Sequence, residues 1–208
     1  VSDPWKVKAA MDFSIETIRN NINEEGMISY TGGKDNPDMY VDTIGLVCPF
    51  LALYAKIFNA SEWEDISFYQ IQMFHKYGLY ENTALPNHAF HIKSKLPLGI
   101  YGWGRGTAWY LIGLMDTYNN LENVMYKKVL KEWIHEAAEK YIVYQRGDGG
   151  FGAILQRDQT YDSSATATFA WFYECCYELF SEQKYKQVEE KCMNKLLSCT
   201  RISGAIDW

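Results

Sequence analysis

The sequence predicts an all-α protein built from helical hairpins, and three observations lead to that fold class. Apolar residues recur at helical spacing through most of the chain, whereas the alternation typical of β-strands is almost absent. Short and long connections alternate between the predicted helices. The segments that follow the long connections resemble one another at a spacing of roughly 60 residues. Stacked hairpins of this kind form an α/α toroid, and an ordinary helical array without a central cavity is the alternative.

The apolar periodicity sets the expected helices. They cover residues 5–22, 43–58, 62–77, 106–118, 121–145, 164–180 and 183–199. Pro4 suits the first turn of the first helix. Asp162 and the serines that follow it can cap free backbone N–H groups at the start of the sixth helix. Pro49 lies inside the second periodic stretch, where proline removes a backbone hydrogen bond, so we expect a kink or a late helix start there.

The lengths of the connections predict how the hairpins are arranged. Long connections fall at about 23–42, 77–105 and 146–163. Short turns make antiparallel helix pairs, so the three long loops are expected to share one rim. Small residues after each long loop let inner helices crowd around an axis, with this rim as the mouth. The expected helices are too few for a ring of six hairpins, so we expect residues 1–208 to be a single domain that forms part of a longer (α/α)6-like barrel.

Composition narrows the classes of function. The chain has 20 Lys and Arg against 26 Asp and Glu, a net charge of -6, and no basic run, so we expect no nucleic-acid partner. We expect no stretch to have the roughly 18 to 20 consecutive apolar residues of a membrane span, and therefore no membrane partner. Five cysteines without a CxxC pair favour reduced thiols and a cytoplasmic location. Aromatic residues reach 16%, enough to pack thick helical layers or to line a cleft for sugar rings.

The strongest local motif is Gly102-Trp103-Gly104-Arg105-Gly106, where a long loop enters a helix. Glycine allows a tight turn and close backbone approach, so Arg105 can point into the rim and bind a carboxylate. Trp103 and Trp109 would then be flat apolar walls. The alternative is that both tryptophans belong to the core and that Arg105 closes an internal ion pair.

Asp42 holds the equivalent place one hairpin earlier, next to Tyr40. A carboxyl group partly removed from water at a cavity mouth could act as a general acid, or it could simply cap the helix. Asp162 is a third carboxylate in such a position, and helix capping explains it better. His88 and His91 lie in the middle long loop, where a neutral imidazole could donate to a substrate or share a proton with an acid.

The remaining motifs are weaker indications of function. His75 and His135 lie on helices without a partner at ligand spacing, and the adjacent Cys175 and Cys176 face different sides of a helix, so we expect no metal site. The glycine-rich loop at 147–152 lacks the Lys and Ser/Thr of a phosphate-binding loop.

Four segments, in this order, resemble motifs of the unsaturated glucuronyl and rhamnogalacturonyl hydrolases, glycoside hydrolase families 88 and 105. They are YVDTIGLVCPFLALYA from Tyr40, NHAF from Asn87, YGWGRGTAW from Tyr101 and DSSATATFAWFY from Asp162. The resemblance covers most of residues 26–180 and implies an (α/α)6 barrel. The family's other important Asp lies upstream of the Asp42 motif, and its closing hairpins follow the last helix, so the resemblance also favours a longer barrel.

The resemblance implies a hydrolase of unsaturated uronyl oligosaccharides that works without a metal or other cofactor. Such enzymes hydrate the ring double bond left by a polysaccharide lyase. Asp42 would protonate a carbon of the vinyl ether and then take a proton from the attacking water, and the hemiketal product releases the neighbouring sugar. His88 matches a substrate-contacting histidine, although His91 remains possible.

By the same resemblance, Trp103, Arg105 and Trp109 match positions that line the sugar site, and Tyr40 adjoins it. Two other functions remain open at this point. One is a non-catalytic protein of carbohydrate binding or polysaccharide biosynthesis on the same toroid. The other is a sugar epimerase, which needs paired histidines from different hairpins, whereas His88 and His91 share one loop.

Overall fold

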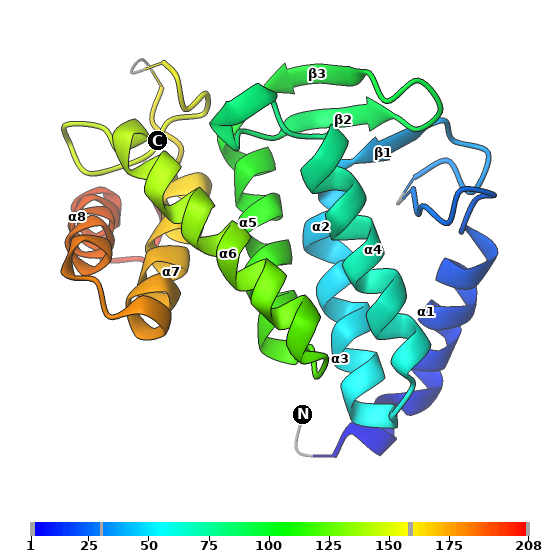
Figure 1. Cartoon of the computed structure of the whole chain (residues 1–208). Coiled ribbons are helices and arrows are strands. Elements are labelled where there is room, and N and C mark those ends of the chain that lie inside the picture. The colour runs from blue at the N-terminus through cyan, green and yellow to red at the C-terminus, as the bar shows by residue number, and fades with distance from the viewer. Residues whose placement is uncertain (1–2, 30, 158–159, 207–208) are drawn as a thin grey trace.

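The computed structural model describes residues 3–29, 31–157 and 160–206, and it is mainly helical (Figure 1). The helices are α1 (Lys8–Asn20), α2 (Val41–Leu46), α3 (Cys48–Phe58), α4 (Ser61–Tyr77), α5 (Gly104–Asn120), α6 (Val124–Tyr141), α7 (Ser163–Phe180) and α8 (Gln183–Cys199). Short 3-10 turns are η1 (Pro4–Val7), η2 (Glu81–Thr83) and η3 (Ile142–Tyr144). Each expected helix is therefore present, and the predicted fold class of helical hairpins of the α/α toroid is confirmed.

The helix starts follow the local chemistry predicted for them. Pro4 stands in the first turn of η1, where its missing N–H costs nothing. Asp162 caps α7 and accepts a hydrogen bond from the backbone N–H of Ala165 at 3.0 Å. The second periodic stretch is interrupted at Val47, and α3 starts directly after it with Pro49 in its first turn. The late helix start expected from Pro49 is thus confirmed.

A small antiparallel sheet covers one end of the helices, and the sequence analysis did not predict it. Its strands are β1 (Asp38–Tyr40), β2 (Asn87–His91) and β3 (Pro97–Tyr101), in the order β1-β2-β3. The prediction of almost no strands was therefore wrong for two of the long connections. These strands are short and contain Pro, Gly and His, so they carry too little alternation to be detected by pattern.

The long loops lie at one end of the molecule, as expected. Figure 1 shows the sheet along the top, with the described loop residues 21–29 and 31–37 to its right and 145–157 and 160–162 to its left. The short turns after α3 and α5 lie at the opposite end. Backbone bonds join the loops to the helix starts: the N–H of Gly104 donates to Ala153 at 2.8 Å, and that of Leu155 donates to Gly102 at 2.9 Å.

Glycines allow the inner helices α2 and α5 to touch. A side chain at Gly45 would place its Cβ 2.6 Å from the backbone oxygen of Trp109, and one at Gly113 would place it 2.5 Å from Ile44. Both distances are too short for any other residue, so close packing of α2 on α5 requires glycine at both positions. This agrees with the role predicted for small residues after the long loops.

One described segment, Val41–Phe58, has the length and apolar composition of a possible membrane span, with a mean hydropathy of 1.6 over 18 residues. The sequence analysis expected none. Half of this window is buried inside the fold, and the segment is broken into α2 and α3. Packing against α4 and α5 accounts for its apolar character, as in the core helices of other folds.

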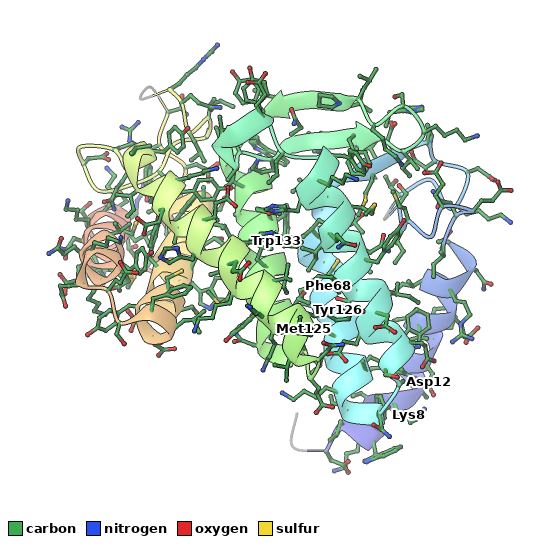
Figure 2. All side chains as sticks on the ribbon, in the orientation of Figure 1. Lys8, Asp12, Phe68, Met125, Tyr126 and Trp133 are labelled. Carbon is green, nitrogen blue, oxygen red and sulfur yellow. The ribbon has the colours of Figure 1, made fainter. Side chains whose placement is uncertain are left out.

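Four rings form a ladder between the outer helices α4 and α6. His75 stacks on Trp133 at 3.9 Å between ring centroids, Phe68 lies 6.1 Å from Trp133, and Phe68 stacks on Tyr126 at 4.0 Å. Figure 2 labels Phe68, Tyr126 and Trp133 along this seam, and Lys8 and Asp12 on α1. Stacking of this kind adds to the apolar burial that holds the two hairpins together.

Candidate active site

Asp42 lies in the first turn of α2, directly after β1. Its side chain is 13% exposed, and its Oδ2 atom is buried without a hydrogen-bond partner among the described residues. The helix has no side-chain hydrogen bond at its cap, which is Tyr40, so the capping alternative for Asp42 is not what the structure shows. A buried acceptor with no partner is costly, and in a native protein it commonly serves a ligand or a reaction.

His88 is the histidine that the fold brings to this carboxylate. Its Nε2 atom lies 3.6 Å from Oδ2 of Asp42, just beyond hydrogen-bond length. Its ring meets Tyr40 edge to face at 5.3 Å and Trp103 at 5.4 Å. His91 lies on the opposite face of β2, three residues on, and its Nδ1 atom accepts from the backbone N–H of Ser94 at 3.1 Å. Of the two candidates, the structure therefore joins His88 to Asp42.

A bulge in β3 helps to set the position of His88. Asn87 pairs with Tyr101 and Ala89 with Leu98, so β3 has one extra residue opposite His88. Gly99 lies in this step with φ of +76°, and a Cβ there would lie 2.9 Å from the Cβ of His88. The sequence analysis missed Gly99, and its one signal was a glycine within a short apolar run.

Trp103 and Arg105 lie where the middle loop becomes α5. A Cβ at Gly106 would lie 2.7 Å from the Trp103 ring, which folds over the first turn of the helix. Arg105 is 55% exposed, and its guanidinium carbon lies 5.4 Å from the centroid of the Trp103 ring. Its Nε atom is 3.8 Å from Oδ2 of Asp162. The internal ion pair considered above therefore exists as a long contact that leaves much of the side chain exposed.

Trp109 plays a different structural part. It is half-buried and packs against the core, with its ring and backbone against Gly45 of α2. Because Trp109 follows Arg105 by four residues, both lie on one face of α5. Tyr40, Asp42, His88, Trp103 and Arg105 form one chain of contacts. Trp109 lies one helical turn below it.

Two other features of the described residues are relevant to ligand binding. His135, Glu139 and Glu182 present possible metal-ligating atoms within 4.8 Å of one another. The Nζ atom of Lys184 already lies 2.8 Å from both carboxylates, so a cation there would have to displace an ammonium group. A groove of about 360 Å³ between α5 and α7 is lined by Ile112, Asp116, Ala167, Thr168 and Trp171, none of them a predicted site residue.

The chain is similar to known proteins in sequence and in fold. The sequence model of Glycosyl Hydrolase Family 88 matches residues 4–206. A search of curated protein sequences gives no match. A possible family 105 member from Salmonella enterica is structurally similar with a TM-score of 0.84 at 20% identity, covering 99% of this chain and 57% of its own.

Two further solved structures have similar folds. The unsaturated glucuronyl hydrolase of Bacillus sp. GL1, described as responsible for the degradation of glycosaminoglycan, has a TM-score of 0.72 at 18% identity, covering 95% of this chain and 56% of its own. An unsaturated glucuronyl hydrolase specific for heparin has a TM-score of 0.77 at 20% identity, covering 94% of this chain and 56% of its own. The chain thus spans a little over half the length of these structures.

Proposed function

Because the chain belongs to glycosyl hydrolase family 88, we propose that it hydrolyses unsaturated uronyl oligosaccharides by hydration of the ring double bond. The observation that carries the proposal is the buried Oδ2 of Asp42, which lacks a hydrogen-bond partner among the described residues and lies 3.6 Å from Nε2 of His88. Two of the similar structures are named as unsaturated glucuronyl hydrolases, which supports this substrate class.

Asp42 serves as both acid and base in the proposed reaction. Its protonated carboxyl group gives a proton to a carbon of the vinyl ether, and water adds to the neighbouring ring carbon that becomes electron-poor. The Asp42 carboxylate then takes a proton from this water, so the group returns to its first state. The hydrated product is a hemiketal, which opens and releases the neighbouring sugar.

The groups around Asp42 have distinct roles in this proposal. An N–H of the His88 imidazole faces the carboxylate that forms after the first proton transfer and stabilises its charge. The Tyr40 and Trp103 rings hold His88 from two sides, and Trp103 offers its remaining surface to the sugar. The exposed guanidinium of Arg105 binds the uronate carboxylate.

The location of the protein belongs to the same proposal. The five cysteines are unpaired, and burial, the main cause, raises the pKa of the Cys175 thiol to about 11. Unpaired thiols suit a reducing compartment, and a cytoplasmic location is therefore part of the proposal.

Replacement of Asp42 by Asn tests the proposal. Asn keeps the size of the side chain but cannot give or take the proton, so turnover of unsaturated disaccharides should fall by about 10²- to 10⁴-fold. Loss of absorbance from the double bond measures turnover, and the melting temperature reports the fold. Asp116→Asn is the matched control, because Asp116 is also a partly buried carboxylate of an inner helix but lies about 16 Å along α5 from Arg105.

The outcome separates the candidate functions. An Asp42→Asn variant as active as the parent would reject the role of Asp42. A parent protein that binds glycans without consuming the double bond would favour the non-catalytic alternative. Interconversion of free sugars would indicate an epimerase; the other histidines, His75 and His135, lie on α4 and α6, whereas His88 lies on β2.

A further inference from the structure

The geometry points to Asp162 as a positioning residue that holds Arg105 ready for the substrate carboxylate, beyond its role as a helix cap. The identity of the substrate carboxylate rests on the proposed function, whereas the contact between Asp162 and Arg105 does not. The sequence analysis explained Asp162 by capping alone, and capping occupies only one of its two carboxylate oxygens.

Both hydrogen bonds of the cap go to one oxygen. Oδ1 of Asp162 accepts from the backbone N–H of Ala165 at 3.0 Å and from the hydroxyl of Ser164 at 2.7 Å. Oδ2 points to the neighbouring helix, where Nε of Arg105 lies 3.8 Å away. A serine or asparagine could also cap α7, so capping does not require the second oxygen or its negative charge.

The carboxylate is held firmly on its own side. The Asp162 side chain is 8% exposed, its backbone N–H donates to Phe151 at 3.0 Å, and its backbone oxygen accepts from the hydroxyl of Thr166 at 2.8 Å. These bonds fix the backbone of Asp162, and the two bonds to Oδ1 fix its side chain. A fixed anion is therefore available at the edge of the candidate site.

The start of α5 is tied to the same place. The backbone N–H of Gly104 donates to Ala153 at 2.8 Å, and a Cβ on Gly104 would lie 3.1 Å from the Cβ of Ala165 in the first turn of α7. The first turns of α5 and α7 are thus in direct contact. This contact fixes where the backbones of Arg105 and Asp162 lie relative to each other, because each residue is next to it in one of the two helix starts.

Arg105 is then held between two groups. Trp103 lies against its guanidinium at 5.4 Å, and Asp162 faces its Nε at 3.8 Å. This contact uses the inner end of the guanidinium, while 55% of the side chain is exposed and its terminal nitrogens can reach a carboxylate. An arginine oriented before binding loses less side-chain freedom when it binds, so Asp162 should lower KM more than it raises kcat.

Replacement of Asp162 by Asn separates capping from positioning. Asn keeps the cap but removes the charge, so we expect an unchanged melting temperature, a KM for unsaturated disaccharides raised about tenfold and a kcat within about twofold. Asp3→Asn is the matched control: Asp3 also caps a helix, accepting from Trp5 at 3.1 Å, but it lies near the N-terminus at the far end of the fold. It should leave KM unchanged.

A second measurement does not depend on activity. In the ¹⁵N-arginine spectrum, the Nε–H signal of Arg105, assigned with Arg105→Lys, should shift and become more mobile in Asp162→Asn but not in Asp3→Asn. In an Arg105→Met background, Asp162→Asn should add little to KM, because no cation remains at position 105 for Asp162 to hold.

Each result decides the question. An unchanged Arg105 signal in Asp162→Asn overturns the inference, as does a tenfold rise in KM that persists in the Arg105→Met background. If the parent protein turns over no unsaturated disaccharide, the proposed function fails, and the spectrum alone decides whether Asp162 positions Arg105.

Discussion

His75 and His88 both lie beside a tryptophan, but in opposite settings. His75 stacks face to face on Trp133, and its Nδ1 atom lies 2.8 Å from the hydroxyl of Tyr110. His88 meets Trp103 edge to face, with its Nε2 atom 3.6 Å from a carboxylate oxygen that lacks a hydrogen-bond partner among the described residues. The first polar contact is complete within the fold, whereas the second leaves an acceptor available.

The two settings show how a histidine beside a tryptophan can have different roles. Between α4 and α6, burial is the main cause that lowers the pKa of His75 to about 4, so this ring is a neutral part of the ladder near pH 7. At the rim, short strands and a glycine-rich helix start bring Asp42, His88 and Arg105 together at the protein surface. The first region is a packed part of the fold, and the proposed chemistry lies in the second.

The largest expected effect comes from the titration of His75. The pKa is about 4 in the folded protein and 6.5 without the fold, so only the unfolded chain binds this proton between those values. The stability linked to a neutral His75 is therefore full above pH 6.5 and falls by up to about 3 kcal/mol as the pH drops to 4.

His75→Phe tests this titration, because it keeps a flat ring in the ladder but removes the proton site. Denaturant unfolding at several pH values should show a shallower loss of stability in the variant than in the parent. Equal slopes in the two proteins would mean that His75 accepts its proton equally well in the folded state, and the proposed contrast with the rim would fail.

His88→Ala should change turnover much more than stability, unlike His75→Phe. Removing the group that faces Asp42 should lower turnover of unsaturated disaccharides by about 10- to 100-fold, whereas the free energy of unfolding should change by about 0.5 kcal/mol or less, because the side chain is 38% exposed. His91→Ala, on the other face of β2, is the matched control and should keep full turnover. A large loss of stability in His88→Ala would show that this histidine belongs to the core.

The smallest expected effect is that of Tyr126→Phe. The variant loses the hydrogen bond from the Tyr126 hydroxyl to Asp65 at 2.9 Å but keeps the ring stacked on Phe68. We expect the free energy of unfolding to fall by about 0.5 kcal/mol, since net gains from exposed hydrogen bonds are small. Tyr126→Ala provides the comparison, and a similar cost in the two variants would deny the ladder its stabilising role.

The longer helices were predictable because each has an apolar face several turns long, and the short α2 was predicted only as part of one stretch with α3. Pro49 and Asp162 fixed two boundaries through local chemistry that does not depend on the rest of the fold. The sheet was not predictable, because β1 has three residues and takes its place only when it pairs with β2 across about 50 positions of sequence. No local pattern records such a pairing.

The candidate site was predictable in part. Glycines around Arg105 indicated a close backbone approach, which the contacts of Gly104 and Gly106 confirm. The choice of His88 over His91 needed the strand direction, and the ladder through His75 needed the packing of two helices. The roles assigned to Asp42 and its neighbours stay predictions until the variants are measured.

The bulge in β3 has a consequence for how the rim can change. The extra residue lies in the edge strand β3, whereas His88 lies in the central strand β2 and Tyr40 in the other edge strand, β1. The pairs Ala89–Leu98 and Phe90–Pro97 separate this bulge from the turn of the β2–β3 hairpin, so insertions or deletions in that turn should leave His88 in place. Under the proposed function, remodelling of that turn would change the surface of the rim while Asp42 and His88 keep their positions.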